Sequence, residues 1–324
     1  MAPLEKIKGP IKEELAKFEP FFKNTVKIDV PLLGAVMNYM LRTKGKQIRP
    51  IFVFLSAKLN GTINESTYNA ASAIELLHTA TLIHDDVVDE TYERRGLFSI
   101  NALWKNKIAV LAGDYMLATG LLLALKFREY DFLQLISKSV DEMSKGEILQ
   151  IEKSRKLDIT EEVYFEIIQK KTASLMATSA ALGAASVSKD PEVINKMREI
   201  GQLIGMAFQI KDDIFDYEAK GIIGKPTGND IKERKLTLPL IHVLSKSPLH
   251  VRLRILYLVR RKNKNKEKVR EIIDFVIKNG GIEYAIIKMN EFRDKAIEML
   301  KEFPESETRQ SFIDLVYFVT TRDK

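Results

Sequence analysis

The chain has 324 residues, 45% of them hydrophobic, which is ample for a large buried core. It contains no cysteine, so a disulfide framework and a zinc–thiolate site are excluded. The formal net charge is +7. Near the motifs described below the basic residues are isolated rather than gathered in a dense stripe, which favours a phosphorylated small substrate over nucleic acid.

The chain shows no internal boundary and no targeting segment. No low-complexity stretch or Ser/Pro-rich linker divides it, so residues 1–324 are predicted to form one domain, and the Lys-rich run 260–268 is interpreted as an exposed loop between helices. Residues 1–14 lack the apolar segment of a secretory signal. The most apolar stretch, 108–125, is interrupted by Asp114, and no segment reaches the ~20 apolar residues of a membrane span. We therefore predict a cytoplasmic protein without a transmembrane segment.

Helical periodicity dominates the sequence. Glycine and proline are sparse and fall between long segments in which apolar residues recur every three to four positions, as in 32–40, 74–85 and 200–210. Alternating patterns typical of strands are scarce. The sequence predicts an all-α fold of roughly ten or more helices.

The first motif along the chain is Gly-Lys-Gln-Ile-Arg-Pro at 45–50, which joins two predicted helices. Its basic side chains are Lys46 and Arg49. Arginine forks and lysine ammonium groups are the usual protein ligands of a diphosphate. Taken alone, each is more often an exposed surface charge.

An acidic cluster, His-Asp-Asp-Val-Val-Asp-Glu, follows the apolar pattern of the segment 74–85. A helix places Asp85 and Asp89 on one face, and Asp86 and Asp89 are three residues apart. Such like-charged pairs cost ~0.2–0.5 kcal/mol each on an exposed helix and more when buried. The cluster therefore needs a counter-charge, and carboxylate oxygens suit a magnesium ion that shares its ligands with substrate phosphates.

The histidines near this cluster permit another interpretation. His78 and His84 can be structural residues of an amphipathic helix, or metal ligands of the kind found in HD-type phosphohydrolases. The second interpretation leaves the remaining motifs without a role. Among those motifs are the basic residues Arg94 and Arg95, just after the cluster, and the pair Lys171-Thr172 in a mid-chain helix.

A second acidic cluster lies more than a hundred residues later, on another apolar helix. It consists of Asp212, Asp213 and Asp216 and follows Gln209 and Lys211. One such cluster is as consistent with a solvated acidic helix face as with a metal site. Two matching clusters embedded in apolar sequence favour two facing carboxylate walls that clamp a diphosphate through divalent ions.

A glycine-rich segment at 224–230 completes the set of motifs. It contains Lys225 and is followed by Lys235. It lacks the Walker pattern of a P-loop, so it is not interpreted as a nucleotide site.

Together these motifs resemble the trans-isoprenyl diphosphate synthase (polyprenyl synthetase) family. The motifs at 45–50, 78–95, 171–172, 209–216 and 224–240 match in the family's order, and the resemblance covers nearly the whole chain. The lead-in Thr-Ala-Thr-Leu-Ile-His at 79–84 is most similar to octaprenyl and other medium- to long-chain synthases. The resemblance implies an isoprenoid synthase fold, which is a helix bundle around a deep central cavity, and a homodimer.

The resemblance also implies roles for individual residues. Magnesium would be bound by Asp85, Asp86 and Asp89 from one wall and by Asp212, Asp213 and Asp216 from the other. The allylic diphosphate would be held by Arg94, Lys171, Thr172, Gln209, Lys225 and Lys235. Isopentenyl diphosphate would be held by Lys46, Arg49, His78 and Arg95. The catalytic set would be Asp85, Asp86, Asp89, Asp212, Asp213, Lys171 and Lys235.

The resemblance also bears on product length. In the family, short-chain synthases place bulky aromatic residues four or five positions before the first aspartate. Here those positions are Thr81 and Ala80, which with Leu77 are candidates to line a chain-length tunnel. This predicts a medium- to long-chain polyprenyl diphosphate.

Three alternatives to this function stay open. They are a geranylgeranyl or farnesyl diphosphate synthase, a terpene cyclase, and a non-catalytic subunit of a heteromeric synthase. The second cluster, Asp-Asp-Ile-Phe-Asp, departs from the pattern usual in cyclases.

Overall fold

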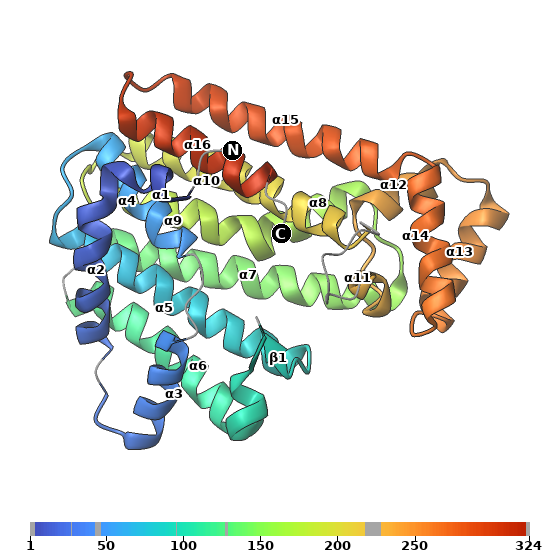
Figure 1. The fold of residues 1–324 in the computed structure, drawn as a ribbon, viewed down its shortest axis with the longest axis horizontal. Helices are drawn as coiled ribbons and strands as arrows, with labels where there is room; N and C mark the ends of the chain where they lie inside the picture. The colour runs from blue at the N-terminus through green and yellow to red at the C-terminus, as the bar shows by residue number, and fades with distance from the viewer. Residues whose placement is uncertain are drawn as a thin grey trace.

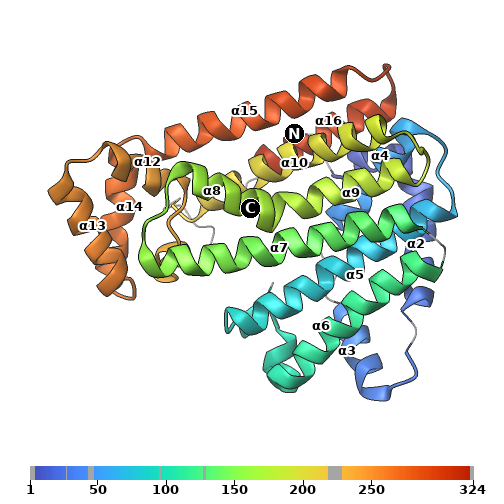
Figure 2. The same cartoon turned by 180° about the vertical axis from the view of Figure 1, so that it is seen from behind.

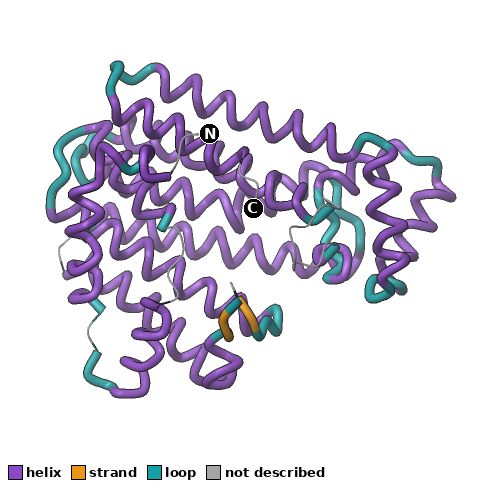
Figure 3. Tube along the Cα trace, viewed as in Figure 1, coloured by secondary structure: helices purple, strands orange, loops and turns teal. Residues whose placement is uncertain are grey.

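The structure is a computed structural model and describes residues 4–26, 28–42, 47–94, 96–126, 129–217 and 228–321. These residues are almost entirely helical (Figures 1 and 3). The exception is a hairpin of two short antiparallel strands, β1 (Glu93–Arg94) and β2 (Leu97–Phe98). The predicted all-α class is confirmed.

The first half of the chain forms the N-terminal helices and most of the bundle. Its elements are α1 (Leu4–Ile7), the 3-10 turn η1 (Gly9–Ile11), α2 (Lys12–Thr25), α3 (Pro31–Arg42), α4 (Ile48–Asn60), α5 (Glu65–Val88), α6 (Ile100–Lys126) and α7 (Tyr130–Lys156). The periodic segments 32–40 and 74–85 are thus helical, as predicted. Of the motif 45–50 the structure describes residues 47–50, which form the N-cap and first turn of α4.

The second half completes the bundle and adds a smaller group of helices at one end. It consists of α8 (Glu161–Ile168), the π-helix η2 (Gln169–Ala173), α9 (Ser174–Ala185), α10 (Pro191–Phe215), α11 (Asn229–Lys232), α12 (Leu238–Lys246), α13 (Leu249–Arg261), α14 (Lys266–Lys278), α15 (Gly281–Lys301) and α16 (Glu307–Thr321). The run 260–268 forms the end of α13, a four-residue loop and the start of α14, so less of it is loop than predicted.

The long helices lie side by side (Figures 1 and 2). Helix α5 packs along α6, α9 packs along α4 and α10, and α15 covers the other side of α10. Helices α12, α13 and α14 gather at the end of the molecule toward which the C-termini of α5, α7 and α10 point. Two apolar clusters form the core, and α10 and α15 contribute to both.

Local sequence explains where the two acid-bearing helices begin and end. Asn64 caps α5 in a capping box with Thr67, and Asp190 caps α10, where Pro191 occupies the first helical position. Helix α5 ends at Val88 and α10 at Phe215. Each acidic cluster therefore lies in the last turn of its helix, and each helix ends on the last aspartate of its cluster as C-cap.

Helix α6 departs from the prediction about membrane spans. By length and mean hydropathy alone it is the one helix among the described residues that could cross a membrane. Of its most apolar stretch, 39% is buried inside the protein. Its glycines allow close packing on α5, because a Cβ on Gly113 or Gly120 would touch His84 or Ala73 of that helix. Packing on α5 therefore accounts for part of the hydropathy of α6.

Candidate active site

The first acidic wall is the C-terminal end of α5. Asp86 is buried and its backbone oxygen accepts hydrogen bonds from Asn101 Nδ2 at 3.1 Å and from the amide of Thr91 at 2.9 Å. These contacts hold the helix end against α6. Carboxylates here lie at the negative end of the helix dipole, which disfavours each by ~0.3–1 kcal/mol. The wall therefore favours a cation beside it.

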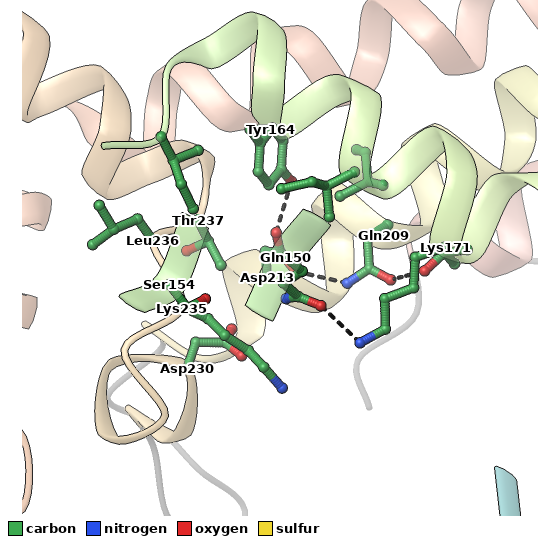
Figure 4. A pocket seen from close by; sticks show the side chains of 14 residues that line it. Gln150, Ser154, Tyr164, Lys171, Gln209, Asp213, Asp230, Lys235, Leu236 and Thr237 are labelled. Atoms are coloured by element: carbon green, nitrogen blue, oxygen red, sulfur yellow. Dashed lines mark hydrogen bonds between the residues drawn. The ribbon is translucent and has the colours of Figure 1, made fainter. Parts of the chain in front are cut away.

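The second wall is the C-terminal end of α10, where a hydrogen-bond network surrounds the buried Asp213 (Figure 4). Tyr164 Oη donates to Asp213 Oδ2 at 2.6 Å, and Gln209 Nε2 donates to Asp213 Oδ1 at 2.8 Å. Thr172 Oγ1 in turn donates to Gln209 Oε1 at 2.7 Å. The network joins α8, η2 and α10, so Thr172 and Asp213 are held in fixed relation to each other.

Asp216 connects this wall to α11. Its two carboxylate oxygens accept the backbone N–H groups of Asn229 and Asp230, each at 2.9 Å. The chain reaches this position through Gly228, whose φ of +76° suits glycine. Asp216 thus fastens the start of α11, and with it Asp230, to the end of α10.

Burial raises the pKa of several acids at this wall. It raises the pKa of Asp213 to about 7, with Asp212 and Asp216 adding repulsion and the donors Tyr164 and Gln209 opposing the shift. The pKa of Asp230 is raised well above its usual range by burial and by the charges of Asp213 and Asp216. The raised pKa values mean that the negative charges of these buried acids are unfavourable as they stand. A cation bound beside them would offset that cost.

Lys235 joins the two walls. Its Nζ lies 4.0 Å from Asp89 Oδ1 and 2.6 Å from Glu233. Burial alone would lower the pKa of Lys235, but the hydrogen bond with Glu233 and the charges of Asp89, Glu233 and Asp230 outweigh it and raise the pKa to about 12. Lys235 therefore stays positively charged, and it lies between the first wall and the pocket beside Asp213 that is described next.

A pocket of about 120 Å³ opens beside Asp213 (Figure 4). It is lined by Gln150, Ser154, Ile159, Tyr164, Ile167, Ile168, Lys171, Thr172, Gln209, Asp213, Asp230, Lys235, Leu236 and Thr237. Two lysines, six neutral donors and two acids therefore line one cavity, together with four apolar side chains. This combination suits a charged ligand held by both lysines and by cations on the acids.

A π-helical turn brings Lys171 and Thr172 to this pocket. Residues Gln169–Ala173 form η2 between α8 and α9, and such turns often occur at functional sites because they shift the helix register locally. The turn is confined from both sides: a Cβ on Gly146 of α7 would lie 2.8 Å from Lys171 N, and a Cβ on Gly205 of α10 would lie 2.5 Å from Ala173 Cα. Because backbone atoms cannot yield to such contacts, these two positions require glycine.

Lys171 is further restrained by neighbours on α7. It is ion-paired with Glu147, and its Nζ donates to Gln150 Oε1 at 2.7 Å. These partners hold the ammonium group at the pocket wall.

The predicted isopentenyl diphosphate site is only partly described. Arg49 Nη1 lies 2.8 Å from His78 Nε2, so α4 and α5 bring together two residues that are 29 positions apart. Because a guanidinium only donates, this Nε2 accepts the hydrogen bond. Lys46, Arg95 and Lys225 lie outside the described residues, and of Arg94 only the backbone, in β1, is described.

The remaining predicted residues lie one to three turns before the acids on α5. Ala80 and Leu77 are buried, and Thr81 is half-buried with its hydroxyl bonded to His78 O at 2.8 Å. His84 faces α6, where its Nε2 lies 3.2 Å from Asp114 Oδ1. The two histidines thus contact different partners, which gives no support to the phosphohydrolase interpretation.

Sequence reasoning missed four residues of this site: Tyr164, Gln150, Asp230 and Thr237. Asp230 ends the glycine-rich segment and lies between Lys225 and Lys235, two predicted ligands, so the sequence offered a signal for it. Tyr164 and Gln150 carried no signal, because a tyrosine or glutamine in an amphipathic helix is ordinary. Their roles depend on contacts between helices.

The residues present fit a divalent cation that completes its coordination with other ligands. Among the described residues, no three histidine, aspartate or glutamate side chains converge closely enough to enclose an ion alone. Oxygen donors at two helix ends and mutual repulsion of the buried acids nevertheless suit a hard cation that keeps waters or substrate phosphates in its shell. The individual ligands stay predictions.

Comparisons of the sequence with known proteins identify the family. A family model described as polyprenyl synthetase matches residues 30–276. An all-trans-nonaprenyl-diphosphate synthase (geranyl-diphosphate specific) of Rhodobacter capsulatus is 34% identical, over 98% of this chain and 97% of its own. Heptaprenyl diphosphate synthase component 2 of Bacillus subtilis is 32% identical, over 96% of this chain and 89% of its own.

Solved structures with the same fold are named as prenyl synthases too. A polyprenyl synthase from Caulobacter crescentus complexed with calcium and isoprenyl diphosphate is 29% identical, with a TM-score of 0.91 over 99% of this chain and 98% of that one. A geranylgeranyl pyrophosphate synthase from Bacteroides thetaiotaomicron is 38% identical, with a TM-score of 0.84 over 98% of each chain. The chain therefore belongs to the polyprenyl synthetase family.

Proposed function

We propose that this protein is a trans-polyprenyl diphosphate synthase, which condenses isopentenyl diphosphate onto an allylic prenyl diphosphate. One observation carries the proposal: Lys235 lies 4.0 Å from Asp89 of the first wall and also lines the pocket beside Asp213 of the second. The two acidic helix ends and the cationic pocket are therefore parts of a single site. Family membership and full-length relatives named as prenyl diphosphate synthases support the reaction type.

We assign the metal to magnesium, bound by aspartates of both walls together with the substrate's phosphates. When bound, it neutralises the diphosphate and stabilises the negative charge that develops as this group leaves. Asp85 and Asp89 would serve from α5 and Asp212 from α10. Asp213 and Asp216 already accept hydrogen bonds on each of their oxygens, so their contribution would use the remaining lone pairs.

The chain's own cations bind and orient the substrates. Lys171 and Lys235, which both line the pocket, would hold the allylic diphosphate, and Thr172 would donate to it. As the allylic C–O bond breaks, these groups stabilise the departing anion. Arg49, with His78, would hold isopentenyl diphosphate so that its double bond attacks the allylic carbon. The proton then lost goes to the departing diphosphate, so no side-chain base is required.

An incubation of the purified chain tests the function directly. With magnesium, an allylic diphosphate and labelled isopentenyl diphosphate, we expect label to enter a longer prenyl diphosphate. A cyclase would instead release a cyclic hydrocarbon from the allylic substrate alone. The word "component" in the name of the Bacillus subtilis relative makes a heteromeric synthase the second candidate. A chain that binds both substrates yet forms no product alone would support that candidate.

We further propose a medium- to long-chain product, with the tail passing the small residues Ala80 and Thr81. Replacing Ala80 by phenylalanine should then shorten the product to about three or four units while the first condensation continues, because overpacking blocks the tail and leaves the acids in place. Chromatography of dephosphorylated products from both proteins measures this. Ala80 is buried on the side of α5 that faces α6, so phenylalanine at this position can also destabilise the fold. The unfolding temperature of the variant is therefore measured together with its products.

Thr81→Phe provides the companion variant. Thr81 is only half-buried, so a larger side chain is accommodated there with less strain than at Ala80. Shortening by Thr81→Phe alone would place the tunnel on that side of the helix. An unchanged product distribution in both variants would remove this stretch of α5 from the tunnel, and a short wild-type product would contradict the long-chain assignment.

We propose a cytoplasmic homodimer made of a single domain. The outer side of α6 carries apolar side chains that are exposed in the single chain, among them Leu111 at 55% and Leu122 at 61%. A second copy covering this face would remove them from water. Both substrates carry diphosphates, which do not cross membranes unaided, and this supports a cytoplasmic location.

A further inference from the structure

The protein's positive charge is concentrated in one segment, residues 249–268. This segment comprises α13, the following loop and the start of α14, and contains eight Lys and Arg residues against one acid, Glu267. Its net charge of +7 equals that of the entire chain. The other 304 residues carry 43 basic and 43 acidic side chains and are neutral in sum. The charge is therefore a local property of one end of the molecule (Figure 1).

Helix α13 also exposes an apolar stripe. Leu249, Leu253 and Tyr257 are spaced four residues apart and are 70%, 57% and 56% exposed. At 100° per residue they lie within a narrow sector of the helix. The opposite face holds the buried Ile255 and Val259, which pack into the core. Large apolar side chains that are more than half exposed and aligned on one helix are characteristic of a surface that binds an apolar partner.

Arginines flank the stripe on both sides. By the same 100° spacing, Arg252 lies on one edge and Arg254 and Arg261 lie on the other. Arg254 is ion-paired with Glu271. In contrast, no described residue forms an ion pair with Arg252, Arg261 or the three lysines of the adjoining loop and helix start, Lys262, Lys264 and Lys266. These charges are available to an external anion.

We propose that the basic patch, defined as the exposed face of α13 with the loop 262–265, docks on an anionic phospholipid surface. An amphipathic helix with an apolar stripe between rows of arginine lies in the interface plane, with its apolar side chains among the acyl chains and its cations at the headgroups. The phosphate backbone of a nucleic acid would engage the charges but offers no apolar surface to Leu249 and Leu253. The combination of both features selects a membrane.

The patch adjoins the active site. Asn263 Nδ2 donates to the backbone oxygen of Lys232 in α11, and the same short helix carries Asp230 of the pocket. Docking through α13 would therefore hold the site close to the bilayer, the phase in which a prenylated product dissolves. The docking itself does not rest on the proposed reaction and can be tested without substrate.

Vesicle flotation with the whole protein tests the proposal. We expect binding to phosphatidylcholine vesicles that contain phosphatidylglycerol, little binding to phosphatidylcholine alone, and release as salt is raised. The variant Arg252→Gln/Arg261→Gln/Lys262→Gln/Lys264→Gln should bind at least ~50-fold more weakly, since each basic residue near an anionic surface contributes roughly a five-fold factor. The matched control is Lys12→Gln/Lys17→Gln/Lys138→Gln/Lys295→Gln, which removes the same charge from exposed positions elsewhere and should change binding less than ~3-fold.

A second variant separates a membrane from other polyanions. Leu249→Gln/Leu253→Gln keeps every charge and should weaken binding to anionic vesicles by about 10-fold, because less apolar area leaves water. It should leave binding to heparin unchanged. Equal loss of vesicle binding in the quadruple variant and its control would overturn the proposal. So would tight binding to heparin or DNA by a protein that fails to float with anionic vesicles.

Discussion

Replacing Asp85 by alanine is expected to lower turnover by ~100-fold or more, because the variant loses an electrostatic stabiliser of the leaving diphosphate. Asp85 lies in the last turn of α5, where a carboxylate opposes the helix dipole by ~0.3–1 kcal/mol. The unfolding temperatures of both proteins, measured without metal, should show that the variant is still folded. Loss of turnover without loss of stability is the result that identifies a functional acid.

Two measurements make the Asp85 result specific. Titration with Mn²⁺ followed by electron paramagnetic resonance should show weaker metal binding in Asp85→Ala, with no substrate turnover involved. Asp131→Ala, which removes an exposed acid at the start of α7, is the control and should leave both metal binding and turnover unchanged. Near-normal turnover with unchanged magnesium dependence in Asp85→Ala would contradict the assignment.

Replacing Arg49 by alanine is expected to raise the KM for isopentenyl diphosphate by about 10- to 150-fold, since a lost charge-assisted hydrogen bond to a bound anion costs ~1.5–3 kcal/mol. The KM for the allylic substrate should change by less than ~3-fold, because in the proposed site Lys171 and Lys235 bind that diphosphate in a pocket that Arg49 does not line. Steady-state kinetics with each substrate varied in turn measures both constants.

Conservative and distant variants sharpen this test. Arg49→Lys keeps the charge but loses the planar fork that contacts His78, so it should recover only part of the affinity. Arg198→Ala removes an arginine of similar burial that pairs with Glu142 at 3.2 Å, and should leave both constants unchanged. A similar rise of both constants in Arg49→Ala would mean that the two diphosphates share one set of ligands.

The sequence alone determined the helices and the positions of the acids on them. Periodic segments such as 74–85 and 200–210 form helices because apolar spacing and helix geometry are both local, and the same spacing puts Asp85 and Asp89 at one helix end. Two acidic clusters more than a hundred residues apart could be recognised for the same reason. The family resemblance added the expected fold and roles, and the comparisons confirm the family.

Only the tertiary structure decided how these helices share a site. Tyr164 reaches Asp213 across 49 positions, and nothing in the pattern around a buried tyrosine indicates its partner. The π-helical turn at Lys171 depends on how closely Gly146 and Gly205 let two other helices approach, which helix periodicity does not encode. Likewise the length and hydropathy of α6 would allow a membrane span, and only the structure shows that one side of this helix packs on α5. Each of these features depends on contacts between residues distant in the chain, and such contacts are fixed only when the helices pack.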